Sequence, residues 1–277
     1  GKKHFSGEAW VQSLQNPETG ILFQYSNYGN NEFVGSSYSV MPYLEVPLFN
    51  SKTKKLHLNS AIGASYFDKN FDDGKNWQNK AISTKITWAY RMFLYYSLFS
   101  NNSFNTRASL GYSHHSNGHV KWPNQGLNTF SIGLNFKFNS KPIETITSSI
   151  DNIDTKPKSF YHFKAGIGQQ SLYRLENSRK EVYSTSFAYG KIYKNTYKIG
   201  IGLFYKFYEN YYDYIKDEKY LVNEDYPNLK KNPFYNSSAY GLFINGEILM
   251  NHFAFEAEIG INIDKPFYKI DYRLNNE

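Results

Sequence analysis

The feature of this sequence that most constrains its fold is a regular alternation of apolar and polar residues over long segments. Side chains alternate faces along a β-strand, so each such segment is predicted to be a strand with one apolar and one polar face. The apolar face of residues 82–98 carries Ile82, Ile86, Trp88, Tyr90, Met92, Leu94, Tyr96 and Leu98. Residues 197–207 and 252–264 alternate in the same way, whereas helical periodicity is nearly absent. The chain is therefore predicted to be all-β.

The predicted strands are longer than those of most soluble proteins. A tilted strand needs roughly 9–11 residues to cross a bilayer, whereas soluble strands usually have about 5–6. The long segments are 36–49, 55–67, 81–99, 103–116, 127–138, 159–171, 181–193, 196–208, 238–250 and 252–264. Segments 20–28 and 267–274 are shorter candidates.

Composition narrows the class further. The chain has no Cys, which excludes disulfide scaffolds, thiolate zinc sites and thiol nucleophiles. Its 26 Tyr, 22 Phe and 4 Trp argue against intrinsic disorder. It contains no apolar run of about 18 residues, so a membrane-spanning helix is not expected. Many aromatics on strands with one apolar and one charged or small-residue face are typical of outer-membrane barrels. We predict an antiparallel up-and-down transmembrane β-barrel of about 12 or more strands in a bacterial outer membrane.

The connections between the segments alternate in length. Residues 51–54 and 100–102 are expected to be tight turns, as on the periplasmic side of such barrels. The longer polar connections are 68–80, 117–126 and 209–237. By this pattern 68–80 and 117–126 are expected on the outer side of the membrane.

We expect a single barrel domain over residues 1–277. The polar connection 139–158 contains Pro142 and Pro157 and is predicted to be periplasmic, with a linker between two domains as the alternative. The polar end of the sequence lacks the terminal aromatic common in barrels, so the terminal strands are expected to be incomplete.

One stretch breaks the apolar wall. In segment 103–116, continuing the alternation places His114 and Ser116 on the apolar face. In segment 127–138, Asn128 shares the parity of the apolar residues, and a hairpin brings it beside His114. Polar side chains against lipid are costly without partners, so a functional cluster is indicated on the outer wall.

These residue types suit ester cleavage in the membrane. Ser116 is the candidate nucleophile, His114 the base that takes its proton, and Asn128 the group that orients the imidazole. Backbone amides at Asn117 and Gly118 are the candidate oxyanion donors. The neighbouring wall residues expected along an acyl chain are Leu110, Tyr112, Phe130 and Ile132.

The motif His114-x-Ser116-Asn117-Gly118, followed by Pro123-Asn124-x-Gly126-x-Asn128, resembles the active-site signature of lipid A 3-O-deacylases of the PagL type. The resemblance implies an outer-membrane barrel that hydrolyses the ester-linked 3-hydroxyacyl chain of lipid A, a carboxylic ester hydrolase with lipopolysaccharide as its partner. Weaker similarity to the same family extends to Asn16-Pro17-x-x-Gly20 and to Gly35. The family commonly has Glu where this chain has Asn128, and residues 101–142 contain no acidic residue.

Other functions stay open on the sequence. A His-Ser-Asn set also resembles outer-membrane phospholipase A, although loop 117–126 lacks an obvious calcium pattern. A non-catalytic barrel, such as a channel or adhesin, would leave His114 and Ser116 as ordinary rim residues. A soluble β-rich domain would need its aromatic face covered by other protein.

The remaining histidines and charged residues are predicted to have structural or solvent-exposed positions and no catalytic role. His115 is predicted to face the lumen in a structural role, and His119 to lie in the outer loop. No metal, cofactor or nucleic-acid partner is expected, and the oligomeric state is left open. The net charge of +7 suits lipopolysaccharide phosphates and any other anion. Lumen-facing basic residues (Lys85, Arg91, Arg107 and Lys137) are expected to pair with Glu45, Glu256 or Glu258, and Asp72 and Asp73 to be solvated.

Overall fold

The computed structural model describes residues 1–49, 55–101, 103–138 and 156–276. These residues form twelve strands in two antiparallel sheets, together with a few helices. The predicted turn at 51–54 lies outside the described residues, as does most of the connection 139–158. By contacts, the described chain divides into two compact units: residues 1–118 with 123–138, and residues 119–122 with 156–276. The expected single domain remains a prediction.

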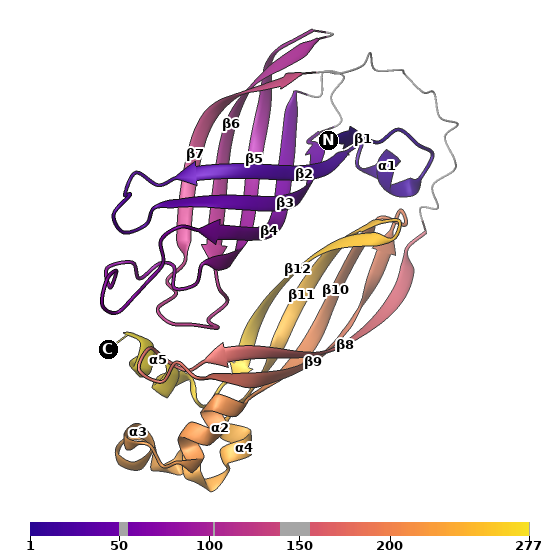
Figure 1. The fold of residues 1–277 in the computed structure, drawn as a ribbon. Coiled ribbons are helices and arrows are strands. Elements are labelled where there is room, and N and C mark those ends of the chain that lie inside the picture. Colours follow the sequence, from indigo (N-terminus) through magenta and orange to yellow (C-terminus); the bar gives the residue numbers. More distant parts are fainter. Residues whose placement is uncertain (50–54, 102, 139–155, 277) are drawn as a thin grey trace. The chain divides into compact units, whose positions relative to one another are not determined.

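The first unit contains a seven-stranded meander in which each strand pairs with the next along the chain (Figure 1). Its strands are β1 (Lys2–Lys3), β2 (Glu18–Asn27), β3 (Ser36–Pro47), β4 (Leu56–Phe67), β5 (Ile86–Ser100), β6 (Phe104–Ser116) and β7 (Leu127–Phe138). A short helix, α1 (Ala9–Ser13), precedes β2. Most bounds confirm the predicted segments within a few residues.

The second unit contains a five-stranded meander ordered β12-β11-β10-β9-β8 (Figure 1). Its strands are β8 (Lys158–Ser171), β9 (Arg179–Tyr193), β10 (Tyr197–Tyr208), β11 (Ser238–Met250) and β12 (Phe253–Asp264). All pairings in both sheets are antiparallel, which confirms the predicted all-β antiparallel class. The strand pairs of the described residues form two open sheets, one of seven strands and one of five.

The strands of the first sheet carry their apolar side chains on an exposed face and bury many of their polar ones. Phe130 and Ile132 of β7 are 81% and 88% exposed. On the opposite face of the first sheet, Arg107 is buried and donates to Glu45 at 2.7 Å. Lys137 of β7 pairs with Glu18 of β2. The first sheet is curled (Figure 1), so the polar faces of its first long strand and of its last strand approach each other.

The predicted ion pairs are confirmed in part. Arg107 and Lys137 both reach Glu45, the latter at 3.7 Å. Arg91 instead donates to Gln24 and to the Tyr95 hydroxyl, and Lys85 is exposed. In the second sheet, Glu256 and Glu258 pair with Lys164 of β8, at 2.7 and 2.6 Å.

Two sequence predictions of secondary structure are wrong. Segment 267–274, expected as a strand, is mostly helix α5 (Tyr268–Asn276), because Phe267, Ile270 and Leu274 recur at helical spacing and pack on one side. The long connection 209–237, expected as a loop, folds into helices. They are α2 (Glu209–Lys216), α3 (Tyr220–Glu224), the 3-10 turn η1 (Pro227–Lys231) and α4 (Pro233–Asn236).

The segment 81–85 is also not part of a strand, since β5 begins at Ile86. Its backbone bonds to loops instead: the amide of Gly126 donates to the Ala81 carbonyl, and the Asn79 side chain accepts from the Ile82 amide. This short stretch therefore packs beside the loop that precedes β7.

The helices of the second unit enclose an apolar cluster, which we call the helical cluster. Its buried residues are Leu172, Tyr211, Tyr214, Ile215, Val222, Phe267 and Ile270. Tyr211, Tyr214 and Ile215 share one side of α2 at the spacing of a helical turn, and α5 covers them. None of the helices in the described part of the chain is long and apolar enough to cross a membrane.

Candidate active site

The β6–β7 hairpin places the three candidate residues as their parity predicted. Its register sets His114 opposite Asn128 and Leu110 opposite Ile132. Asn128 is exposed, and His114 and Ser116 are half-buried, while their neighbour His115 points to the buried side. His114, Ser116 and Asn128 therefore share the exposed, apolar face of the sheet.

A hydrogen bond joins His114 to Asn128. The imidazole Nδ1 lies 2.6 Å from Asn128 Oδ1, and the Tyr112 hydroxyl donates to the same oxygen at 2.7 Å. An amide oxygen can only accept, so His114 Nδ1 carries the hydrogen in this contact. In a neutral ring this leaves Nε2 with a lone pair, which is the form a general base needs.

Ser116 is held by different partners. Its Oγ accepts from Asn124 Nδ2 at 2.9 Å and from the Gly118 amide at 3.2 Å. Among the hydrogen bonds of the described residues, none joins Ser116 to His114. The two side chains lie two residues apart on one face, so a direct proton transfer between them requires a change of side-chain conformation.

Both backbone amides that were predicted to bind the oxyanion already donate hydrogen bonds to other groups. The Asn117 amide donates to Asn124 Oδ1 at 3.1 Å, and the Gly118 amide donates to Ser116 Oγ. The Asn117 side chain is buried and donates to Ser83 Oγ at 2.8 Å. Gly118 has φ +67°, a left-handed conformation that favours glycine, so the chain turns sharply just after the serine.

Asn124 is the site residue to which sequence reasoning gave no role, although it stands in the motif. It is buried, and its carboxamide bonds both the Asn117 backbone and the Ser116 hydroxyl. The sequence feature that could have identified it is its position in the motif, between Pro123 and Gly126. Gly126 is explained too: its φ is +74°, and a Cβ there would lie 3.0 Å from Cε1 of His114.

The expected acyl-facing wall is exposed beside these residues. Leu110, Phe130 and Ile132 are 55%, 81% and 88% exposed. Tyr112 is half-buried, with its ring 5.2 Å from that of Phe130 and its hydroxyl on Asn128. Tyr112 thus belongs to the wall and to the polar cluster at once.

The other histidine and carboxylate predictions are accounted for structurally. His115 is 2% exposed, lies 3.2 Å from the Tyr28 hydroxyl, and packs edge-on against Phe67. Asp72 accepts from the amides of Gly74 and Lys75, as in an ordinary polar turn. Within the described ranges, no three His, Asp or Glu side chains gather as metal ligands would.

Comparison with known families covers both units. Residues 3–137 match the family model described as lipid A 3-O-deacylase (PagL), and residues 159–273 match the one described as acyloxyacyl hydrolase, C-terminal domain. Both descriptions are of hydrolases, so the class indicated is a β-sheet hydrolase that acts on lipid A. The two matches together span nearly the whole chain, and the chain belongs to the lipid A 3-O-deacylase (PagL) family. Searches of curated proteins and of solved structures give no match.

Proposed function

We propose that this protein is a serine esterase of the bacterial outer membrane that removes the ester-linked 3-hydroxyacyl chain of lipid A. The observation that carries the proposal is the cluster of Ser116, His114 and Asn128 on an exposed apolar sheet face. An acyl ester in a membrane leaflet is presented to such a face, whereas a soluble substrate would be met in a water-filled cleft. Family membership supplies the lipid A substrate.

The fold supports a membrane-embedded barrel. The ten strands β3–β12 have 12 to 15 residues, more than a tilted strand needs to cross the bilayer core. Their outward apolar side chains would face lipid, and the buried ion pairs would line a narrow polar interior. Closure of the strands into one barrel would also remove the open sheet edges, which are otherwise prone to aggregation.

The proposed reaction proceeds in two acyl-transfer steps. His114 Nε2 takes the proton of Ser116 as its Oγ attacks the ester carbonyl, and the protonated imidazole then gives that proton to the departing sugar oxygen. Water attacks the acyl-serine, with His114 again as base, and the free 3-hydroxy fatty acid leaves. Asn128 holds the ring through Nδ1 in both steps.

Asn124 is proposed to stabilise the oxyanion. When Ser116 turns to His114, the Asn124 Nδ2 donor and the Gly118 amide both lose their acceptor beside the reacting carbon. Donors preorganised where negative charge develops lower the barrier most effectively. The arrangement therefore provides one side-chain and one backbone donor, in place of the pair of backbone amides first expected at Asn117 and Gly118.

The nucleophile is tested with purified protein and lipid A. Ser116→Ala should lower the rate by about 10⁴-fold or more, measured as the mass loss of one 3-hydroxyacyl chain. Ser113→Ala is the matched control, because Ser113 is on the same strand but buried on the opposite face. Equal rates for wild type and Ser116→Ala would reject the serine. Cleavage of phospholipid alone, and only with calcium, would reject the deacylase in favour of a phospholipase A.

The orienting role is tested at Asn128. Asn128→Ala should lower kcat by about 100-fold with little change in KM, because the imidazole loses the acceptor that fixes its tautomer. Asn128→Glu should keep most of the activity, since a carboxylate accepts the same Nδ1–H hydrogen bond. An unchanged rate in Asn128→Ala would show that His114 is positioned by other contacts.

A further inference from the structure

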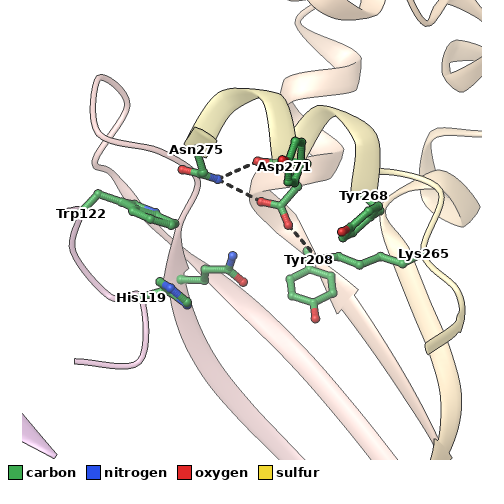
Figure 2. Close-up of a pocket in the computed structure, with 9 residues that line it drawn as sticks. His119, Trp122, Tyr208, Lys265, Tyr268, Asp271 and Asn275 are labelled. Atoms are coloured by element: carbon green, nitrogen blue, oxygen red, sulfur yellow. Dashed lines mark hydrogen bonds and ion pairs between the residues drawn. The ribbon is translucent and has the colours of Figure 1, made fainter. Parts of the chain in front are cut away.

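The second unit contains a hollow that the proposed catalysis does not use (Figure 2). It has a volume of about 350 Å³, within the range of small-ligand sites. Its lining residues are His119, Trp122, Gln170, Tyr208, Lys265, Tyr268, Asp271, Tyr272 and Asn275. The β6–β7 loop supplies the first two, and the ends of β8 and β10 supply the next two. Lys265 lies three residues before α5, and α5 supplies the rest.

The loop wall of the hollow is firmly attached. The Ser171 amide donates to the His119 carbonyl at 3.0 Å, and the Trp122 indole donates to the Ser171 carbonyl at 2.9 Å. The rings of His119 and Trp122 stack, with centroids 4.7 Å apart. The hollow therefore has one preformed aromatic wall.

The charges of the hollow balance one another. Lys265 Nζ lies 2.7 Å from Asp271 Oδ2, and this carboxylate also accepts from Tyr211 and Asn275. Partial burial lowers the pKa of His119, and the nearby Lys265 lowers it further, while Asp271 acts in the opposite direction. The hollow holds no surplus positive charge to attract a phosphate.

The remaining chemistry suits a hydroxylated ring. Trp122, Tyr268 and Tyr272 present flat apolar faces with polar edges, which match the C–H faces of a sugar. Gln170, Asn275 and the Lys265–Asp271 pair present donors and acceptors for hydroxyl groups. Tyr268 and Tyr272 are more than half exposed, so the hollow is open to a large glycan.

We propose that this hollow binds an uncharged sugar ring of the lipopolysaccharide headgroup. The identity of the glycan rests on the proposed function, because lipid A is the membrane anchor of that glycan. The site is also linked to the catalytic hairpin by the chain itself, since His119 follows Ser116 by three residues. Binding of the headgroup here would hold the substrate while the ester is cleaved.

The test measures binding without catalysis. The probe is lipopolysaccharide from which all acyl chains have been removed chemically, titrated into detergent-solubilised protein and followed by saturation-transfer NMR. Tyr268→Ala and Trp122→Ala should each weaken binding by about tenfold. Tyr220→Ala is the control, because this tyrosine is 73% exposed on α3 and does not line the hollow.

Two further arms separate the possible outcomes. Dephosphorylated probe should bind as well as phosphorylated probe, and displacement by inorganic phosphate would overturn the sugar assignment. Absence of binding to wild type, or equal binding by all variants, would overturn the site itself. Ser116→Ala should bind the probe normally, so a failure of the esterase proposal would appear in the lipid A assay while this binding remained.

Discussion

The strands and the helical cluster bury opposite kinds of side chain. Ile132 on β7 is 88% exposed and Glu45 on β3 is 5% exposed, whereas Ile215 in the helical cluster is 1% exposed. The strands thus place apolar atoms outside and charges inside, and the helices do the reverse. One chain cannot satisfy both arrangements in a single solvent. Under the proposed outer-membrane location, the strands would face hydrocarbon and the helices would face water.

The largest effect is expected from a buried charge of the strands. Glu45→Ala leaves the buried Arg107 guanidinium without its carboxylate, and it should lower the free energy of unfolding in detergent by about 3–5 kcal/mol. Urea denaturation measures the loss. Glu258→Ala removes a carboxylate that is far more exposed and should cost less than about 1 kcal/mol. Equal losses would show that the polar side of the sheet is not a true interior.

The next effect contrasts two isoleucines. Ile215→Ala opens a cavity in the helical cluster and should cost about 2–4 kcal/mol. Ile201→Ala, on the exposed face of β10, should change stability in detergent very little because its surroundings are not close-packed protein. Thermal unfolding followed by circular dichroism compares them. A similar cost for both would remove the distinction between the two regions.

The smallest effect is the pH dependence that a tyrosine of the helical cluster contributes to stability. Burial, reinforced by Asp271, raises the pKa of Tyr211 well above its usual value of about 10. Above pH 10 the unfolded chain therefore loses this proton while the folded chain keeps it, so stability falls as pH rises.

Tyr211→Phe should flatten part of that alkaline decline, measured by urea unfolding between pH 8 and about 11. Burial also raises the pKa of Tyr214 to about 12, so some decline should remain. At pH 7 the variant loses the hydrogen bond to Asp271 and should be about 1 kcal/mol less stable. An identical alkaline slope in wild type and variant would contradict the assignment to Tyr211.

Strand positions were predictable because a two-residue period is readable without tertiary information. The same reasoning placed His114, Ser116 and Asn128 on one face, and the pairing of β6 with β7 confirms that placement. The helical cluster was missed because its apolar residues are spread over several separated segments, from Leu172 to Ile270. Each segment alone is short and polar, and only packing of α5 on α2 completes the core.

The details of the site were less predictable. Alternation fixes the face of Ser116 but not its rotamer, and the side chain bonds Asn124 instead of His114. The predicted amides at Asn117 and Gly118 have partners for a related reason: a tight turn satisfies its own backbone groups wherever it can. The catalytic roles themselves remain a proposal.

The attachment of the β6–β7 loop limits how this part of the sequence can diverge. Residues 119–122 belong to the second unit, although residues 118 and 123 on either side belong to the first. The loop is tied on one side through Ser171 and Asn177, and on the other through the contact of Asn124 with Ser116. Surface loops usually tolerate insertions and deletions. A change of length between Gly118 and Pro123 would here detach one of the two anchors, so this loop should keep its length while the residues within it vary.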